Sequence, residues 1–185
     1  MKFLTEWFLE QSVCELIPRK IEDSRGFFSE TYQKNDFAEY GILDDFIQEN
    51  HSFTKFKHTF RGLHFQKPPY DQSKLLRVIK GSILDIVVDL RQSSPSYLKN
   101  RQFHISAENF KQIYIPSGFA HGFLTLEDNC EILYKVSKPY NHSSDVSLSI
   151  FDQELDITLP CSMEEISLSK KDAEGLTISK IGSVF

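Results

Sequence analysis

The sequence predicts an all-β protein that folds as a sandwich or barrel. Aromatic residues make up 13% of the 185 residues, a bias that favours strands. Alanine, the strongest helix former, occurs only at positions 38, 107, 120 and 173, which disfavours a helical bundle. Short β-rich runs recur at intervals of about 8–12 residues between turn residues, as in sandwiches and barrels. The length and the lack of a Gly/Ser-rich linker predict one domain over residues 1–185.

The clearest helix in the sequence is short. It covers Asn35–Tyr40 (NDFAEY), where Asn35 or Asp36 is expected to cap the amino end and Gly41 to end the last turn. We expect this helix to lie at the periphery of the sheets.

Two adjacent β-rich runs, Lys74–Lys80 and Ile83–Leu90, predict strands on either side of Gly81-Ser82. The two-residue spacing indicates a β-hairpin, although Gly-Ser is a weaker turn signal than Asn-Gly. Alternation places the apolar residues at 84, 86, 88 and 90 on one face of the second strand. The other face carries Asp85 and Asp89, so it is either the wet outer surface or the lining of a polar cavity.

Three further strands are expected at residues 112–115 (QIYI), 122–126 (GFLTL) and 131–136 (EILYKV). After Asp156 the strand pattern gives way to a polar stretch, Ser162–Gly175. We expect this stretch to form turns and one or two helical turns over the barrel surface, where it could carry functional residues.

Charge and cysteine content exclude several functional classes. The formal net charge is −5, so no global basic field exists for nucleic acid or an anionic membrane. Three cysteines without C-x-x-C spacing argue against a disulfide framework and a structural zinc site. No apolar stretch approaches the ~18–20 residues of a membrane span, and the first residues do not resemble a signal peptide. We therefore expect a cytoplasmic protein.

The common nucleotide and hydrolase motifs are missing. The sequence has no G-x-G-x-x-G, P-loop, G-x-S-x-G or H-E-x-x-H pattern. Residues 116–121 (PSGFAH) instead resemble the second half-motif of the cupin double-stranded β-helix. The first cupin half-motif supplies H-x-H metal ligands, whereas residues 61–66 here read RGLHFQ, with His64 alone. A three-ligand metal site cannot be assembled from this segment, so the pattern indicates a jelly-roll cavity without metal.

His64 is the first candidate for catalysis. A lone histidine on a strand is more often a satisfied core residue than a functional one. Strand alternation also places residues 61, 63 and 65 on one face and 62, 64 and 66 on the other. Lys74, Tyr134 and Asp172 lie where other strands and the C-terminal segment could meet His64, and this changes the interpretation, although spacing alone does not show that the four residues meet. Removal of a proton next to a ketone requires a base with a pKa of about 7, which histidine supplies, and an acid that returns a proton, which tyrosine can supply. A lysine ammonium can stabilise the oxyanion that forms, and an aspartate bonded to the imidazole can orient the base.

Several segments together resemble the dTDP-4-dehydrorhamnose 3,5-epimerase family, which is cupin-like. The matching stretches run in family order and are RGFFSETY from Arg25, IQENHS from Ile47, RGLHFQ from Arg61, KLLRVIKGSILDIVVDLRQSSPSY from Lys74, SAEN from Ser106, IPSGFAHGFLTL from Ile115, EILYK from Glu131 and LSKKDA from Leu168. The resemblance implies an all-β double-stranded β-helix, or jelly roll, with short peripheral helices. It also implies an isomerase of dTDP-rhamnose biosynthesis that uses no cofactor and no metal.

The resemblance assigns roles to individual positions. His64 would remove the protons at C3 and C5 of dTDP-4-dehydro-6-deoxy-D-glucose, and Tyr134 would deliver protons from the opposite face. Lys74 would stabilise the enolate at O4, and Asp172 would pair with His64. The implied substrate-binding residues are Arg25, Phe28, Glu30, Gln48, Asn50, Arg61, His121, Tyr140, Asp145 and Lys171. The family's dimers exchange N-terminal strands, so we expect a homodimer in which RGFFSETY completes the partner's pocket.

The chain departs from the family pattern at its nucleoside end. Pro139 replaces an aromatic residue, Asp145 replaces a glutamate, and Phe151-Asp152 stands where Trp-Asn is common. Two alternatives therefore stay open beside double epimerisation. One is a mono-epimerase acting at C3 or C5 only, and the other is a non-catalytic sugar-nucleotide-binding jelly roll. A metal-dependent cupin oxygenase is disfavoured by the missing H-x-H.

Overall fold

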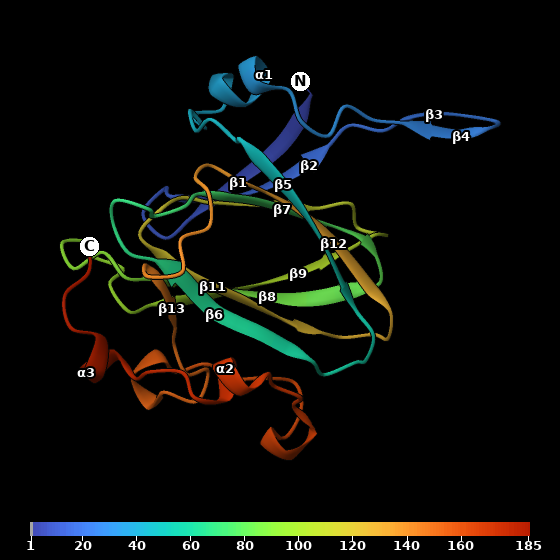
Figure 1. Ribbon diagram of the computed structural model, residues 1–185. Coiled ribbons are helices and arrows are strands. Elements are labelled where there is room, and N and C mark those ends of the chain that lie inside the picture. The colour runs from blue at the N-terminus through green and yellow to red at the C-terminus, as the bar shows by residue number, and fades with distance from the viewer. Residues whose placement is uncertain (1) are drawn as a thin grey trace.

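Two antiparallel sheets pack face to face in the computed structural model, which describes residues 2–185 (Figure 1). In spatial order, the six-stranded sheet contains β1 (Phe3–Phe8), β2 (Val13–Pro18), β10 (Gln112–Ile115), β7 (Lys74–Lys80), β12 (Cys130–Val136) and β5 (Gln48–Thr54). The five-stranded sheet contains β13 (Asp145–Ser147), β6 (Phe60–Gln66), β11 (Phe119–Thr125), β8 (Ser82–Asp89) and β9 (Asn100–Ser106). From β5 onward the chain passes repeatedly between the sheets, which confirms the predicted double-stranded β-helix.

The predicted hairpin between residues 74–80 and 83–90 is wrong. Both strands exist with nearly the expected bounds, but β7 pairs with β10 and β12 while β8 pairs with β9 and β11. Gly81, at φ +77°, carries the chain from one sheet to the other, and a Cβ there would lie 2.7 Å from Cys130 Sγ. The two-residue turn signal is local, whereas the pairing of each strand is decided by strands that follow later in the chain.

The space between the sheets is filled by apolar side chains at one end and by a polar cavity at the other. Val87 and Ile83 of β8 belong to the apolar part, which also contains Phe103, Ile113 and Ile132. Asp85, between them on the same face, is fully buried. The odd-numbered face of β8 therefore points inward, so the outer-surface interpretation of this face is wrong; its residues lie in the packed interior and line neither of the pockets described below.

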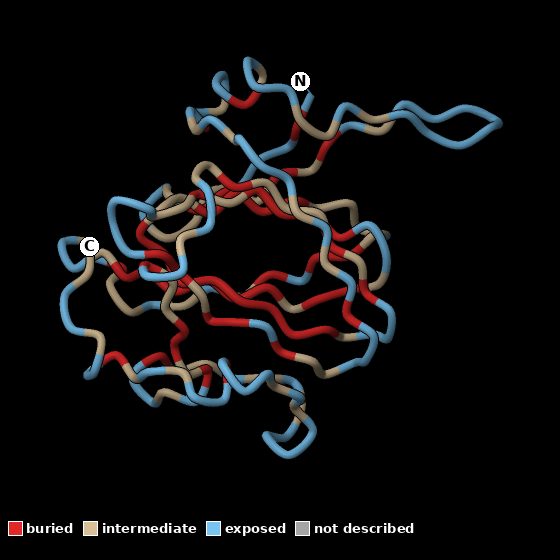
Figure 2. Tube along the Cα trace, in the orientation of Figure 1, coloured by how far each residue is buried: buried red, intermediate tan, exposed pale blue. Residues whose placement is uncertain are grey.

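The outer face of the five-stranded sheet is covered by the C-terminal part of the chain (Figures 1 and 2). This part contains η1 (Gln153–Leu155), η2 (Met163–Glu165), α2 (Lys170–Ala173) and α3 (Ile178–Ile181). Ile86 and Val88 on the even-numbered face of β8 form a second core with Leu148, Leu155 and Ile178. The predicted helical turns over the barrel surface are thus confirmed, and their apolar residues hold them in place.

The outer face of the six-stranded sheet is partly covered by α1 (Lys34–Glu39), whose Phe37 packs in a third cluster. The helix lies one residue earlier than expected at both ends. Its cap is Gln33, whose side chain accepts a hydrogen bond from the Asp36 backbone N–H at 2.8 Å, so the expected cap at Asn35 or Asp36 is wrong. Gly41, at φ +86°, follows the helix as predicted.

A short hairpin, β3 (Ile21–Asp23) and β4 (Gly26–Phe28), projects beyond the two sheets (Figure 1). All six of its strand residues are exposed, including the ring of Phe28 at 64%. Among residues 2–185, no helix combines the length and apolar character that a bilayer span requires.

Candidate active site

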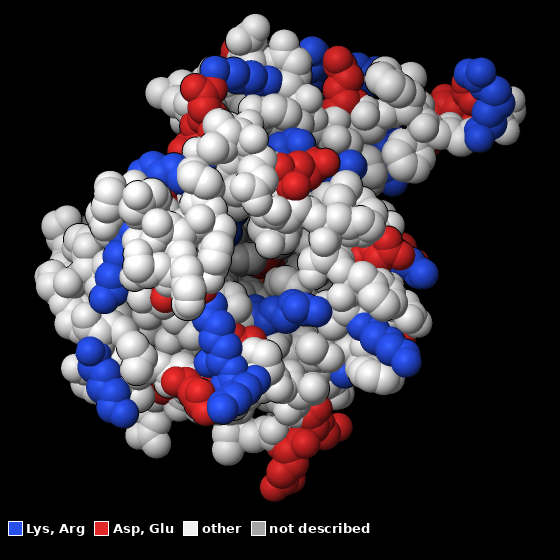
Figure 3. All heavy atoms as spheres, viewed as in Figure 1, with Lys and Arg blue, Asp and Glu red and all other residues white. Residues whose placement is uncertain are grey.

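A cavity of about 540 Å³ opens between the sheets and contains the four residues expected to be catalytic. His64 comes from β6, Lys74 from β7, Tyr134 from β12 and Asp172 from α2. Figure 3 shows a hollow in the middle of the viewed face, with Lys and Arg side chains beside it. The cavity is therefore built from both sheets and from the segment that covers one of them.

Arg61 and His64 both line the cavity, so the predicted strict alternation along β6 is wrong. Arg61 pairs with Phe123 and His64 pairs with His121, so two residues of β6 lie opposite the single residue Gly122. This β-bulge returns residue 64 to the face that carries residue 61. Gly62 adopts φ +134°, and a Cβ on it would lie 2.5 Å from Gly122 Cα. The contact between two glycines therefore sets the register of the site.

His64 forms a short hydrogen bond with Asp172, at 2.6 Å from Nε2 to Oδ1. Asp172 is buried, and its Oδ1 also accepts a hydrogen bond from the Ser147 hydroxyl at 3.2 Å. Burial opposes ionisation of Asp172, but the hydrogen bond and charge of His64 outweigh it and lower the pKa of this carboxyl. An anionic Asp172 fixes the ring of His64 and stabilises its protonated form, which suits His64 to remove a proton.

Lys74 and Tyr134 supply the other polar groups of the cavity. The Lys74 ammonium donates a hydrogen bond to the His64 carbonyl oxygen at 3.3 Å. Burial lowers the pKa of Lys74 to about 8, although the charges of Asp85 and Asp145 act in the opposite direction. Burial raises the pKa of Tyr134, so its phenol keeps its proton at neutral pH and can act as an acid.

The contact that sequence reasoning missed is the one between Asp85 and the cavity residue His121. Its Oδ2 lies 2.7 Å from His121 Nε2, and its buried Oδ1 has no partner within residues 2–185. Burial lowers the pKa of His121 despite the charge of Asp85, so the ring is neutral and bonded to the carboxylate. The available signal was an aspartate in the middle of an otherwise apolar strand, because such a carboxylate needs a buried polar partner.

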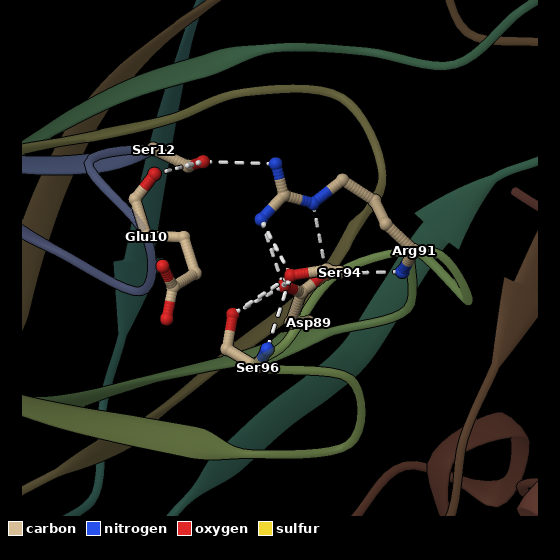
Figure 4. Close-up of polar contacts among 6 residues, drawn as sticks. All are labelled: Glu10, Ser12, Asp89, Arg91, Ser94 and Ser96. Carbon is tan, nitrogen blue, oxygen red and sulfur yellow. Dashed lines mark hydrogen bonds and ion pairs between the residues drawn. The ribbon is translucent and has the colours of Figure 1, made fainter.

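Asp89, the other aspartate on this face of β8, is held in a network of side-chain hydrogen bonds at the end of the strand (Figure 4). It accepts hydrogen bonds from Arg91, Ser94 and Ser96 at 2.6–2.9 Å from their side chains. Arg91 also donates to Ser12 Oγ at 2.8 Å, which ties the turn after β1 to the end of β8. Asp89 therefore supports the fold rather than the cavity.

A second pocket of about 280 Å³ adjoins the cavity and shares His64, Lys74, Tyr134 and Lys171 with it. Its remaining lining includes four residues expected to bind substrate: Gln48, Asn50, Tyr140 and Asp145. Arg61 and His121 line the larger cavity only. We refer to this second space as the smaller pocket.

The structure does not bring three expected binding residues to either pocket. Arg25 lies at the turn of the β3–β4 hairpin, where its guanidinium pairs with Asp23 at 2.6 Å. Glu30 pairs with Lys2 at 3.4 Å, and the ring of Phe28 points into solvent. Within one chain these residues are remote from His64.

No group of three His, Cys, Asp or Glu side chains in the described part of the chain is arranged to hold a metal ion. His64 and His121 each bond to a carboxylate from a different part of the fold.

Comparison with known proteins decides the family. The family model described as dTDP-4-dehydrorhamnose 3,5-epimerase matches residues 10–180. The chain belongs to this family. It is 43% identical over 162 residues to the dTDP-4-dehydrorhamnose 3,5-epimerase of Salmonella typhimurium, a match that covers 87% of each chain.

Solved structures of the epimerase family show the same fold. The dTDP-6-deoxy-D-glucose-3,5-epimerase from Legionella pneumophila, in complex with dTDP-4-keto-L-rhamnose, superimposes with a TM-score of 0.91 at 34% identity over 97% of this chain and 95% of that chain. The dTDP-4-dehydrorhamnose 3,5-epimerase from Bacillus anthracis, with TDP and PPi bound, gives a TM-score of 0.92 at 38% identity over 95% and 99%.

The departures from the epimerase family pattern fall at different places in the structure. Asp145 lies in the smaller pocket, and Pro139 adjoins it through its carbonyl, which accepts a hydrogen bond from Gln66 at 3.2 Å. Phe151 lines neither pocket; it borders a separate groove of about 530 Å³ that is formed within the C-terminal segment, by residues between 150 and 166. Only the first two departures therefore touch the site.

Proposed function

We propose that the protein epimerises dTDP-4-dehydro-6-deoxy-D-glucose at C3 and C5 to give dTDP-4-dehydro-L-rhamnose. The observation that carries this proposal is the placement of His64 and Tyr134 in one cavity, on strands of different sheets. A base on one wall and an acid on the other suit removal of a proton from one face of the sugar and its replacement from the opposite face. Membership of the epimerase family supports the same conclusion.

The proposed reaction at each carbon has two steps. His64 removes the proton next to the C4 ketone, and the electron pair of the broken C–H bond moves into an enolate whose negative charge rests on O4. The Lys74 ammonium stabilises that oxyanion, and Asp172 stabilises the imidazolium. Tyr134 then donates its phenolic proton to the carbon from the opposite face, which inverts the centre. The imidazolium loses its proton to solvent and the phenolate takes one up, which resets the pair for the second carbon. No cofactor is needed, because the ketone accepts the electron pair.

We propose that Gln48, Asn50, Arg61, His121, Tyr140, Asp145 and Lys171 bind the nucleotide sugar. Arginine suits the diphosphate, because its planar guanidinium donates two parallel hydrogen bonds. The exposed β3–β4 hairpin supports a homodimer in which Arg25, Phe28 and Glu30 enter the partner's site. Buried free thiols at Cys14 and Cys130 suit a reducing compartment, so we propose the cytoplasm as its location.

The test is proton NMR of dTDP-4-dehydro-6-deoxy-D-glucose incubated with the protein in D2O. We expect deuterium at both C3 and C5 and accumulation of the L-rhamno product. Exchange and inversion at one carbon only would replace this proposal with a mono-epimerase. Saturable dTDP binding without exchange would favour another activated sugar or a binding protein.

A further inference from the structure

We propose that Asp145 is a positioning residue that holds Tyr140 and Lys171 at the smaller pocket and thereby sets the affinity for the nucleotide. This inference deepens the proposed function and rests on it for the identity of the ligand. Its basis is a set of contacts among three segments that are separate in the chain: the loop after β12, the start of β13 and helix α2.

A single carboxylate oxygen receives both contacts. Asp145 Oδ2 accepts a hydrogen bond from the Tyr140 hydroxyl at 2.9 Å and from the Lys171 ammonium at 2.5 Å. The Asp145 side chain is 10% exposed, whereas the Lys171 side chain is 48% exposed and Tyr140 is 61% exposed. A nearly buried carboxylate thus anchors two side chains that would otherwise be mobile at the surface.

The backbone on both sides of Tyr140 is held by a second buried residue. Gln66 donates a hydrogen bond from Nε2 to the Pro139 carbonyl at 3.2 Å, and its Oε1 accepts one from the Asn141 N–H at 2.6 Å. Gln66 also pairs with Asp145 in the β6–β13 register. Tyr140 is therefore fixed at its backbone by Gln66 and at its hydroxyl by Asp145, so its ring stays beside the pocket before any ligand arrives.

Fixing a side chain in advance reduces the entropy lost on binding. The effect should appear in affinity, because the His64–Asp172 pair is held independently of Asp145; the charge of Asp145 also raises the pKa of Lys74, so its loss additionally changes the pH dependence of turnover. Asp172 follows Lys171 directly, but its carboxylate is bonded to His64 and Ser147, and its backbone N–H bonds to Ser169 Oγ. Loss of Asp145 therefore frees Tyr140 and Lys171 while the His64–Asp172 pair remains in place.

The length of the side chain at position 145 matters for the same reason. Aspartate reaches Tyr140 and Lys171 from β13 with one methylene group, and glutamate would move the carboxylate outward by about one C–C bond. We therefore expect Asp145→Glu to displace the ring of Tyr140 and to weaken nucleotide binding, even though glutamate is common here in the family.

The experiment is a double-mutant cycle on the full-length protein, read by calorimetric titration with dTDP. Tyr140→Phe keeps the ring and removes only its hydroxyl, and Asp145→Ala removes the anchor. We expect each variant to raise the Kd by about 10-fold, and the double variant to bind no more weakly than Asp145→Ala alone. Tyr97→Phe is the matched control, because Tyr97 lines neither pocket.

Three results would overturn the inference: an unchanged Kd in Tyr140→Phe, an unchanged Kd in Asp145→Ala, or strictly additive losses in the double variant. Asp145→Asn, which keeps the shape of the side chain, replaces Asp145→Ala if the alanine variant unfolds. It must weaken dTDP binding through loss of the Lys171 ion pair. Because dTDP binding is measured without turnover, the cycle stays interpretable even if the protein fails to epimerise the proposed substrate.

Discussion

His64 and Asp172 lie 108 residues apart in the chain, yet His64 Nε2 and Asp172 Oδ1 are 2.6 Å apart. The histidine is carried by an inner strand of the five-stranded sheet, and the carboxylate by a four-residue helix that packs against that strand. The pair therefore depends on two separate events, the formation of the barrel and the attachment of the C-terminal segment to it.

Replacing His64 tests the base directly. We expect His64→Asn to reduce kcat by about 10²–10⁴-fold, because it removes the general base that Asp172 holds in the cavity, whereas the other cavity histidine, His121, is buried against Asp85. Deuterium incorporation at C3 and C5 measured by NMR is the readout. His104→Asn is the control, since His104 is exposed on β9 and lines neither pocket. Wild-type exchange in His64→Asn would remove this residue from the base role.

Replacing Asp172 tests the partner of the base. Asp172→Asn should lower kcat, and combining it with His64→Asn should cost little more than His64→Asn alone, because the two residues act as a unit. The variant should also change stability with pH. The lowered pKa of Asp172 stabilises the wild type fully above the ordinary carboxyl pKa, and this gain is lost as pH falls through the folded-state pKa. Urea unfolding at several pH values measures the difference; a pH-independent difference would contradict it.

The pH dependence of turnover should report Lys74. Its pKa of about 8 predicts that kcat falls as pH rises through that value, because the ammonium that stabilises the enolate is lost. The pKa of Tyr134 is raised, so its phenol does not produce this decline. Asp85→Asn removes a charge that raises the pKa of Lys74 and should move the decline to lower pH. A decline that Asp85→Asn leaves unmoved would assign it to another group.

The glycine pair in the bulge should be sensitive to a single methyl group. Gly62→Ala places a Cβ 2.5 Å from Gly122 Cα and 2.9 Å from the His121 carbonyl oxygen. We expect a loss of at least ~2 kcal/mol in the free energy of unfolding. Gly26→Ala is a matched control, because Gly26 has nearly the same φ (+132°) with no atom within 4 Å of the added carbon. Equal losses in the two variants would mean that the backbone angle, not the contact, is responsible.

The shared site can be tested by mixing two inactive variants. In a dimer with exchanged hairpins, a chain carrying Arg25→Met and one carrying His64→Asn together form one complete site and one doubly defective site. Co-refolded equal amounts should therefore recover about a quarter of the wild-type activity. Mixing His64→Asn with Asp172→Asn is the control and should recover nothing, because both residues belong to the same chain's site. Recovery absent from the first mixture would rule out exchange of Arg25.

The strands could be predicted from sequence because each carries its own β-rich pattern, as Lys74–Lys80 does. The pairing of the strands could not be predicted, because Gly81-Ser82 has the sequence of a hairpin turn, whereas in the structure Gly81 connects a strand of one sheet to a strand of the other. The position of Arg61 beside His64 was equally hidden, since the bulge depends on Gly122, which lies far along the chain. Only the family resemblance grouped the four proposed catalytic residues, His64, Lys74, Tyr134 and Asp172. Their spacing in the sequence does not indicate which of them come into contact in the folded protein.

The covering of the five-stranded sheet by the C-terminal segment has a consequence for protein synthesis. Translation delivers His64 and the last barrel strand, Asp145–Ser147, before it delivers Asp172. The same segment also supplies Leu155 and Ile178 to the core on the outer face of the five-stranded sheet. A translation product that ends before this segment would therefore lack both the carboxylate partner of His64 and the apolar cover of that sheet, so completion of the proposed active site coincides with completion of the fold.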